Sequence, residues 1–378
     1  MKIAVNTRFL IKDKMEGLGW YTFEIYTRMA RQHPEDEFVF IFDRPYHSDF
    51  TQLPNVKAKV IPPPARHPYL LKIWYEYSLP FILNSIKPDV FISPDNFCSI
   101  RYQGKTILVV HDLVYRHFPE FIPKNFRRYY EENMPRFIQR ADHIVAISQA
   151  TKNDIIDLAG EEAGLKTTVI YNGVRSSARL ISYEDKDAVK SKFTGGRDYF
   201  LFVGAIHPRK NIRRLVEAYN IYRSSTDDDI PLVLCGRMAW ETDAISREIN
   251  QSPYKSDIVL TGHLNETDLR HLQGGAYALV YPSLFEGFGL PIVESFQARV
   301  PVITSNLSSM AEVAGDAALL CDPYDSENIA KQLIYIRKNR NLARNLIDKG
   351  SERLSMFDWE VASKKFYDEI KQLVNPKM

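Results

Sequence analysis

The chain has 378 residues, enough for two domains that each bury an interior of their own. Hydrophobic residues make up 45% and charged residues 25%, ordinary values for a globular protein that argue against a disordered chain. The formal net charge of +2 gives no global field that would favour nucleic acid. We therefore expect no nucleic-acid partner, and any anion site must be built locally.

Short apolar runs alternate with amphipathic stretches almost from end to end. In the first half, this pattern predicts strands over residues 2–9, 38–42, 59–61, 90–92, 106–110, 143–147 and 168–170. Helices are predicted over 20–31, 69–85, 124–140 and 149–158, and Ser148 is the expected N-cap of the last of these.

A polar stretch follows Val174, and we interpret residues 175–197 as an interdomain connection. The alternation then restarts, with strands predicted over 199–203, 232–235, 258–260, 278–281, 300–304 and 318–320. Strand–helix alternation predicts parallel sheets with helices on both faces, and a restart predicts two such sheets. The expected domains are therefore residues 1–174 and 198–356. The last helical segment, within 357–378, either stays with the second domain or crosses back to the first.

Compartment and membrane signals are few. Cys98, Cys235 and Cys321 show no metal or redox spacing, and an odd number of unpaired thiols fits the reducing cytoplasm. The amino terminus enters a strand without the apolar core of a signal peptide, and no apolar stretch is long enough to predict a spanning helix. The helix over 124–140 mixes basic and aromatic residues, so peripheral contact with anionic lipid remains open, although a solvated helix face is the favoured interpretation.

The strongest functional signal is the run from Ser283 to Glu294, which follows a predicted strand and opens a helix at Pro291. Gly287 and Gly289 allow close approach of backbone to a ligand, and a helix start favours an anion or sugar hydroxyls. Two carboxylates, Glu286 and Glu294, frame this turn and are suited to a polyhydroxylated ligand. The alternative is that Glu286 is a solvated loop residue and Glu294 only complements the helix dipole.

A second signal follows the first strand of the second domain, where Gly204 precedes Arg209-Lys210. A diphosphate leaving group gains charge as its bond to the sugar breaks, and an Arg–Lys pair aimed at it stabilises the transition state more than the ground state. The alternative is a solvated basic turn. The Arg–Lys pair follows the carboxyl end of a strand, where open sheets bind ligands, and this place favours a functional role.

Three weaker signals also lie at strand ends. A buried strand ends at His111-Asp112, Gly17-Leu18-Gly19 follows the first strand, and Gly262-His263-Leu264 follows the strand over 258–260. His111 is favoured as functional over structural because of its place at the expected site. The Gly17 and Gly19 pattern lacks the third glycine and the acidic residue of a dinucleotide fingerprint, so a tight structural turn is as good an interpretation. Gly262-His263-Leu264 is equally compatible with a plain turn.

These motifs together resemble the retaining glycosyltransferases of family 4, which have the GT-B fold of two Rossmann-like α/β domains facing across a cleft. The resemblance implies that Glu286 contacts the transferred sugar, that Glu294 binds the nucleotide ribose, and that Arg209 and Lys210 bind the diphosphate. It implies backbone contacts to the donor from Phe288, Gly289 and Leu290, and contact of the loop at Gly262–Leu264 with the nucleobase. The Gly17 loop would border the phosphate and the acceptor, and His111 would lie beside the donor sugar. The match is specific for the second, donor-binding domain and loose for the first.

The resemblance predicts a hexosyltransferase that moves a mannose- or glucose-like sugar from a nucleotide diphosphate donor to a glycan or lipid-linked acceptor in polysaccharide or lipopolysaccharide synthesis. Retention is implied by the family alone. No cofactor or metal is expected, because no Asp-x-Asp cluster stands in a suitable context; the nearest candidate, Asp227-Asp228-Asp229, lies in a polar turn and is expected to face solvent. Two alternatives stay open: a GT-B sugar-nucleotide epimerase, and a catalytically silent nucleotide-sugar-binding subunit of a glycan-assembly complex.

Overall fold

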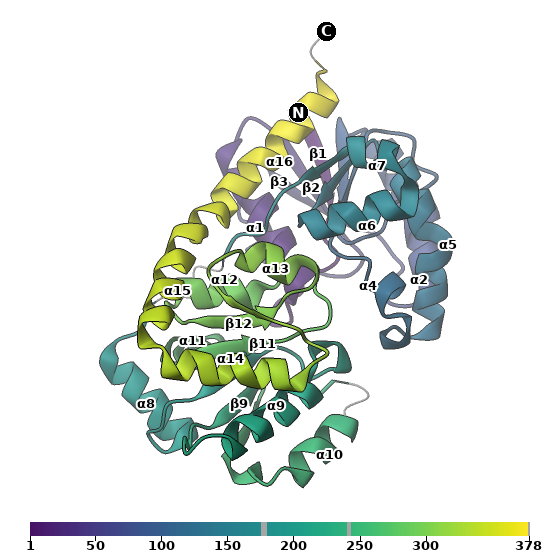
Figure 1. Ribbon diagram of the computed structural model, residues 1–378. Helices are drawn as coiled ribbons and strands as arrows, with labels where there is room; N and C mark the ends of the chain where they lie inside the picture. Colours follow the sequence, from purple (N-terminus) through teal and green to yellow (C-terminus); the bar gives the residue numbers. More distant parts are fainter. Residues whose placement is uncertain (175–179, 240–242, 377–378) are drawn as a thin grey trace. The chain divides into compact units, whose positions relative to one another are not determined.

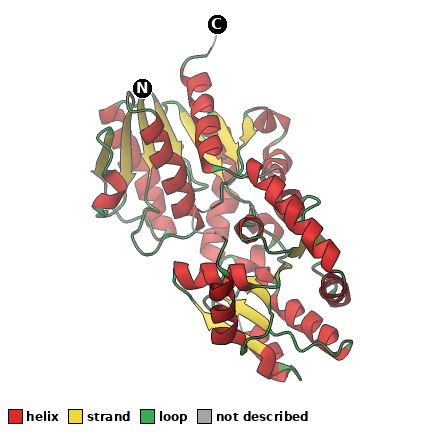
Figure 2. Ribbon diagram, turned by 90° about the vertical axis from the view of Figure 1, so that its left-hand side faces the viewer, coloured by secondary structure: helices red, strands yellow, loops and turns green. Residues whose placement is uncertain are grey.

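The computed structural model describes residues 1–174, 180–239 and 243–376. The chain forms two compact units, Met1–Gly173 with Asp358–Met378, and Val174–Phe357. In each unit a sheet of parallel strands is flanked by helices, drawn in red beside the yellow strands in Figure 2. Both units are thus Rossmann-like, as the alternation predicted.

The first unit has a seven-stranded sheet in the order β3-β2-β1-β4-β5-β6-β7, in which every neighbouring pair is parallel. The strands β4 and β5 are buried along their whole length, which explains their mostly apolar composition. The strands are β1 (Lys2–Asn6), β2 (Glu37–Phe42), β3 (Val56–Val60), β4 (Val90–Ser93), β5 (Thr106–Val110), β6 (His143–Ala146) and β7 (Thr167–Val169). The helices are α1 (Gly17–Gln32), α2 (Pro68–Ile73), the π-helix η2 (Trp74–Ser78), α3 (Leu79–Ile86), α4 (Val114–His117), α5 (Lys124–Arg140), α6 (Gln149–Ala159), α7 (Glu161–Leu165) and α16 (Trp359–Val374), with the 3-10 turns η1 (Ser48–Thr51) and η3 (Pro119–Phe121).

The second unit has a six-stranded parallel sheet in the order β10-β9-β8-β11-β12-β13. Its strands are β8 (Phe200–Val203), β9 (Leu232–Cys235), β10 (Ile258–Gly262), β11 (Ala278–Tyr281), β12 (Val302–Ser305) and β13 (Leu319–Cys321). Its helices, labelled in Figure 1, are α8 (Tyr183–Thr194), α9 (Ile212–Ser224), α10 (Asp243–Gln251), α11 (Glu266–Gly275), α12 (Leu290–Gln297), α13 (Ser308–Ala314), α14 (Ser326–Lys338) and α15 (Arg340–Arg353), with 3-10 turns η4 (Pro208–Lys210), η5 (Lys255–Asp257) and η6 (Leu354–Met356).

Hydrogen bonds at the helix ends follow the local sequence. The Ser148 hydroxyl accepts from the Thr151 N–H, which confirms the predicted cap of α6. The segment 175–197, interpreted as a connection, instead contains α8 within its described part, 180–197. Ser182 caps the N-terminus of α8 and Gly195 ends it in a left-handed conformation, because the polar residues that suggested a linker are also residues that favour helix ends.

The last helix, α16, packs against α1 of the first unit, and Figure 1 shows the two side by side. The Ser363 hydroxyl donates to the Ile25 carbonyl at 3.2 Å, and the Tyr367 hydroxyl donates to Asp36 at 2.7 Å. The chain therefore returns to the first unit after Phe357.

Candidate active site

Two loops leave neighbouring strands of the second sheet at their carboxyl ends. One runs from Gly204 to Lys210 after β8, and the other runs from Pro282 to Gly289 after β11. The strands that follow β8 in the chain, β9 and β10, lie on one side of it, while β11 to β13 lie on the other. The order of the strands therefore reverses between β8 and β11, which is where open parallel sheets bind ligands.

The Glu286 carboxylate pairs with both predicted cations. Lys210 Nζ lies 2.5 Å from Glu286 Oε1, and Arg209 Nη1 lies 2.9 Å from Oε2. The exposed fractions of these side chains are 10% for Glu286, 12% for Lys210 and 23% for Arg209. The interpretations of Glu286 as a solvated loop residue and of Arg209-Lys210 as a solvated turn are therefore wrong.

The charges of this cluster shift the pKa values of its members. Burial alone would raise the pKa of Glu286, but the charges and hydrogen bonds of Arg209 and Lys210 outweigh it and hold the pKa at about 2. Burial, together with repulsion by the same two cations, lowers the pKa of His207 to about 4. At neutral pH the cluster thus contains one carboxylate, two cations and a neutral imidazole.

The two loops are also tied to each other through the backbone. Arg209 Nη1 donates to the Phe285 carbonyl at 2.5 Å, and the Leu284 N–H donates to the Arg209 carbonyl at 2.9 Å. Asn211, buried at the start of α9, donates to the Pro282 carbonyl at 3.0 Å. Neither Asn211 nor these backbone contacts had been singled out from the sequence, because their partners lie about 70 residues along the chain.

Two serines at the start of α13 hold the loop after β11 from another side. Ser308 and Ser309 donate their hydroxyls to the Glu286 carbonyl at 3.0 and 2.7 Å, and Ser309 also reaches the Phe288 carbonyl at 3.1 Å. Neither serine was predicted, although both lie within four residues of the end of β12 and the rule that indicated the other candidates applies to them as well.

The loop after β11 ends where α12 begins. Gly289 is the N-cap of α12 with φ of 102°, a left-handed conformation that strains residues with a Cβ, and Leu290 is the first residue of the helix. Gly287 and Phe288, just before it, are buried. The predicted glycine-rich turn and helix start are therefore present, and such a start favours a negatively charged ligand.

Glu294 lies in α12, one turn beyond its start, and it is buried. Its Oε2 accepts a hydrogen bond from Gln273 Nε2 of α11 at 3.0 Å. Because Glu294 is buried and has a side-chain partner, its role is not limited to complementing the helix dipole, which was the alternative that the sequence left open. Gln273 is a further residue that the sequence did not indicate.

The loops after β9 and β10 continue the same edge of the sheet. Gly262 ends β10, Gly262 and His263 are exposed, and Leu264 is half-buried. The Gly236 N–H donates to the Gly262 carbonyl at 3.1 Å, and a Cβ on Gly236 would lie 1.9 Å from the Gly204 carbonyl oxygen. Close backbone contact thus joins the loops of β8, β9 and β10.

In the first unit, His111 directly follows β5 and is buried. Its Nε2 lies 2.8 Å from the Pro94 carbonyl oxygen, which can only accept, so Nε2 carries the proton. Burial lowers the pKa of His111, against weaker opposing effects from Pro94, Asp112 and Asp95. His111 is therefore a neutral imidazole at neutral pH, with Nδ1 unprotonated.

Gly17 and Gly19 fall in the first turn of α1 rather than in the loop before it. A Cβ on Gly19 would lie 2.6 Å from the Phe9 carbonyl oxygen, whereas a Cβ on Gly17 would meet nothing within 4 Å. Gly19 thus has a structural reason to be glycine, in line with the turn interpretation.

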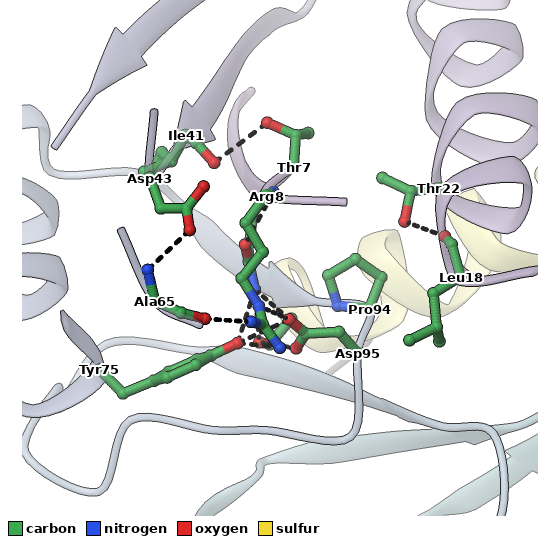
Figure 3. A network of polar contacts seen from close by, with 12 residues as sticks. Thr7, Arg8, Leu18, Thr22, Ile41, Asp43, Ala65, Tyr75, Pro94 and Asp95 are labelled. Atoms are coloured by element: carbon green, nitrogen blue, oxygen red, sulfur yellow. Dashed lines mark hydrogen bonds and ion pairs between the residues drawn. The ribbon is translucent and has the colours of Figure 1, made fainter. Parts of the chain in front are cut away.

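A buried polar network, drawn in Figure 3, lies at the carboxyl ends of β1 and β4. It was not predicted, because β1 was expected to continue to residue 9 and ends at Asn6 instead. Arg8 Nε donates to Asp95 at 2.5 Å, and Arg8 Nη1 donates to the Ala65 carbonyl at 2.9 Å. Asn6 and the Tyr75 hydroxyl also donate to Asp95, at 2.9 and 2.8 Å. The network holds Asp95, which follows β4, and the neighbouring Pro94 accepts the hydrogen bond from His111.

Two family models match the chain, one in each part. "Glycosyltransferase Family 4" matches residues 15–177, and "Glycosyl transferases group 1" matches residues 184–353. This chain belongs to the family 4 glycosyltransferases. Its paired parallel sheets are those of the GT-B fold, as expected.

Curated relatives of this glycosyltransferase cover most of its length. "O-antigen chain mannosyltransferase B" of Escherichia coli is 27% identical over 376 residues, which are 95% of this chain and 97% of the relative. "O-antigen chain mannosyltransferase RfbU" of Salmonella typhimurium is 28% identical over 308 residues, 80% of this chain and 78% of the relative. Among solved structures, Anabaena HepE in complex with UDP and glucose superposes with a TM-score of 0.75 at 16% identity, covering 98% of this chain and all of that one.

The acidic run of the glycosyltransferase faces solvent in part, as the sequence predicted, with Asp228 half-buried. Asp228 pairs with Arg337, whose Nε lies 2.6 Å from Oδ2, and accepts from the Tyr222 hydroxyl at 2.8 Å. Asp227 and Asp229 are exposed. Over residues 1–174, 180–239 and 243–376, no three His, Cys, Asp or Glu side chains gather as metal ligands would. In the same ranges, no helix combines the length and apolar character needed to cross a bilayer.

Proposed function

We propose that this glycosyltransferase moves a mannose-like hexose from a nucleotide diphosphate sugar to a glycan or lipid-linked acceptor, with retention of the anomeric configuration. The observation that carries the proposal is the buried cluster of Arg209, Lys210 and Glu286 at the point where the strand order of the second sheet reverses. The names of the two relatives that act on O-antigen chains support mannose and a polysaccharide acceptor.

The charge balance of the cluster suits a diphosphate. Two cations share the Glu286 carboxylate in a mostly buried place. A donor diphosphate brings negative charge that Arg209 binds through its planar fork and Lys210 through a compact ammonium. Because the charge on the leaving diphosphate grows as the sugar–oxygen bond breaks, the two cations stabilise the transition state more than the bound donor.

Glu286 then has two roles in succession. In the free enzyme its carboxylate keeps the cations paired and in place. When the diphosphate takes over the cations, the carboxylate oxygens become acceptors for hydroxyl groups of the transferred sugar. With a pKa of about 2, Glu286 is ionised throughout the working pH range, so it acts as an acceptor and not as a proton donor.

The remaining donor contacts follow from the same edge of the sheet. We assign the nucleotide ribose to Glu294, which Gln273 orients, and the phosphates to the backbone of Phe288, Gly289 and Leu290 at the start of α12. The backbone of the Gly262–Leu264 loop is proposed to meet the base.

The first unit is proposed to bind the acceptor. His111 is assigned to the side of the transferred sugar, where a neutral imidazole with a free Nδ1 lone pair can meet positive charge that develops at the anomeric carbon. A lipid-linked acceptor would bring the enzyme to a membrane surface. The helix α5 is a poor lipid contact, because Arg127 and Arg128 each pair with a glutamate four residues on.

Metal independence is part of the proposal. Arg209 and Lys210 supply the charge that a divalent ion would otherwise supply to the diphosphate. Activity is therefore expected to survive EDTA without added Mg²⁺ or Mn²⁺. Loss of transfer in EDTA, with recovery on adding either ion, would contradict this part.

The test begins with thermal shifts against UDP-, GDP-, ADP- and dTDP-linked sugars, because a ligand that binds only the folded state raises its apparent stability. A mannose donor is expected to give the largest shift and then to support transfer to a lipid-linked glycan acceptor. Alanine variants of Glu286, Arg209 and Lys210 are expected to lose about 100-fold or more in turnover. The matched control is Asp348→Asn, which removes an exposed ion pair with Arg299 in the same unit.

Each alternative predicts a distinct result. An isomerised sugar nucleotide after incubation with donor alone would indicate an epimerase. Donor binding without turnover over a broad acceptor panel would indicate a silent subunit. NMR of the anomeric proton of the product distinguishes retention from inversion.

A further inference from the structure

Tyr281 is the last residue of β11, the strand next to β8, and its side chain is buried. Its hydroxyl accepts a hydrogen bond from Lys210 Nζ at 2.6 Å and donates one to Glu286 Oε1 at 3.0 Å. Lys210 Nζ also lies 5.0 Å from the centre of the Tyr281 ring. The Lys210 ammonium, the Glu286 carboxylate and the Tyr281 hydroxyl thus form a closed triangle of contacts.

We propose that Tyr281 is a positioning residue of the transfer reaction, whose hydroxyl holds the Lys210 ammonium and the Glu286 carboxylate in their working places. The inference rests on the proposed function, because it assigns Lys210 to the diphosphate and Glu286 to the sugar.

The reason for a fixed hydroxyl lies in the flexibility of lysine. A lysine side chain has many rotamers, and its ammonium has no preferred plane. The aromatic ring of Tyr281 is rigid by comparison, because it is buried at the end of a central strand and stacks on Phe202 with ring centres 5.7 Å apart and an angle of 18°. The hydroxyl is therefore the part of the triangle whose place is set by the sheet.

Donor binding makes this support necessary. In the free enzyme, Lys210 and Glu286 hold each other directly. When a diphosphate attracts the lysine and sugar hydroxyls occupy the carboxylate, that direct contact weakens. The Tyr281 hydroxyl can keep both of its hydrogen bonds during this exchange, since it accepts from the lysine and donates to the glutamate.

The protonation state of Tyr281 suits the role. Burial, followed by the nearby Glu286 carboxylate, raises the pKa of Tyr281 well above its ordinary value. The hydroxyl therefore keeps its proton at working pH, and a phenolate never competes with Glu286 for the lysine. Phenylalanine would fill the same space but offer neither an acceptor to Lys210 nor a donor to Glu286.

The first experiment compares Tyr281→Phe with the wild type in steady-state kinetics. We expect kcat to fall about 10-fold or more while the KM for the donor changes less than about 3-fold, because the hydroxyl acts on groups that matter most in the transition state. The control is Tyr199→Phe, which removes one hydroxyl from another buried tyrosine of the same unit, whose partner is the Leu272 carbonyl at 2.6 Å. This control is expected to keep its kcat.

A double-mutant cycle shows whether Tyr281 acts through Lys210. Tyr281→Phe in a Lys210→Ala background should lower kcat much less than it does in the wild type, since the group that it positions is then absent. Equal effects in both backgrounds, or an unchanged kcat of the single variant, would overturn the proposal. Folding of each variant is checked by the thermal shift with GDP and UDP.

Should Tyr281→Phe fail to fold, 3-fluorotyrosine at position 281 replaces it, since this residue retains the hydroxyl and makes it more acidic. A more acidic hydroxyl is a weaker acceptor for Lys210, so kcat is then expected to fall in the wild-type background and not in the Lys210→Ala background, and equal effects in both backgrounds would refute the inference. Failure of the proposed function is separate: in that case the wild type itself transfers no sugar from any donor of the panel.

Discussion

Replacing Glu286 by glutamine should destabilise the protein. The pKa of this buried carboxyl falls from 4.5 to about 2. Because one pKa unit corresponds to about 1.36 kcal/mol, its ionised form stabilises the fold by about 3 kcal/mol. Removal of one partner from a buried ion pair destabilises other proteins by about 3–5 kcal/mol. We therefore expect Glu286→Gln to lower the free energy of unfolding by about 3 kcal/mol at pH 7.

The dependence on pH has a definite sign. The folded-state pKa of Glu286 is depressed, so its contribution is complete above the unfolded pKa and is lost as pH falls through the folded one. The difference between wild type and variant should therefore be constant from pH 8 to pH 5 and shrink between about 4.5 and 2.

Urea unfolding followed by circular dichroism measures the difference, with Asp348→Asn as the exposed-pair control, for which we expect less than about 1 kcal/mol. The same variant should still bind GDP or UDP, because Arg209 and Lys210 are left without their carboxylate, while sugar transfer falls about 100-fold or more. A loss of stability no larger than that of the control would show that the carboxylate is not buried between the two cations as described. Normal turnover would refute its proposed role with the sugar.

Three further predictions concern other parts of the enzyme. Gly236→Ala should lower the melting temperature sharply, because its Cβ would lie 1.9 Å from a backbone oxygen. In Gly262→Ala the new Cβ meets nothing within 4 Å, and the φ of +69° should cost only about 1–2 kcal/mol of stability. Similar losses of stability in the two variants would contradict the close contact at Gly236. His111→Ala should reduce kcat about 100-fold. Because burial lowers the pKa of His111, the kcat of the wild type should not fall between pH 8 and 6.5. A pKa above 7 in the kcat profile that disappears in the variant would contradict this. Transfer should continue in EDTA, because Arg209 and Lys210 carry the diphosphate charge, and a metal requirement measured in the same assay would oppose it.

Much of the candidate site follows from local patterns. The apolar runs before Gly204 and Pro282 predict buried strands, and the polar residues just after them must then lie at the carboxyl edge of a parallel sheet. This reasoning requires no knowledge of strand order. It found Arg209, Lys210 and Glu286, which the structure joins by ion pairs.

Contacts between distant segments of the chain could not be predicted from local patterns. Ser309 and Asn211 support the loop of Glu286 from other elements. Tyr281 was recognised only as the end of a strand, and its role depends on which strand lies beside β11. Two strands, β9 and β10, separate β8 from β11 in the chain, yet β8 and β11 are neighbours in the sheet.

The sequence by itself determined approximately where the strands lie and which charged residues follow them, because burial and turn formation are properties of short segments, although β1 ends at Asn6 and not at residue 9. Only the tertiary structure decided that Lys210, Tyr281 and Glu286 meet, and that α16 packs on α1. The physical reason is that strand order and helix docking depend on the packing of whole apolar faces, which residues far apart in the chain build together.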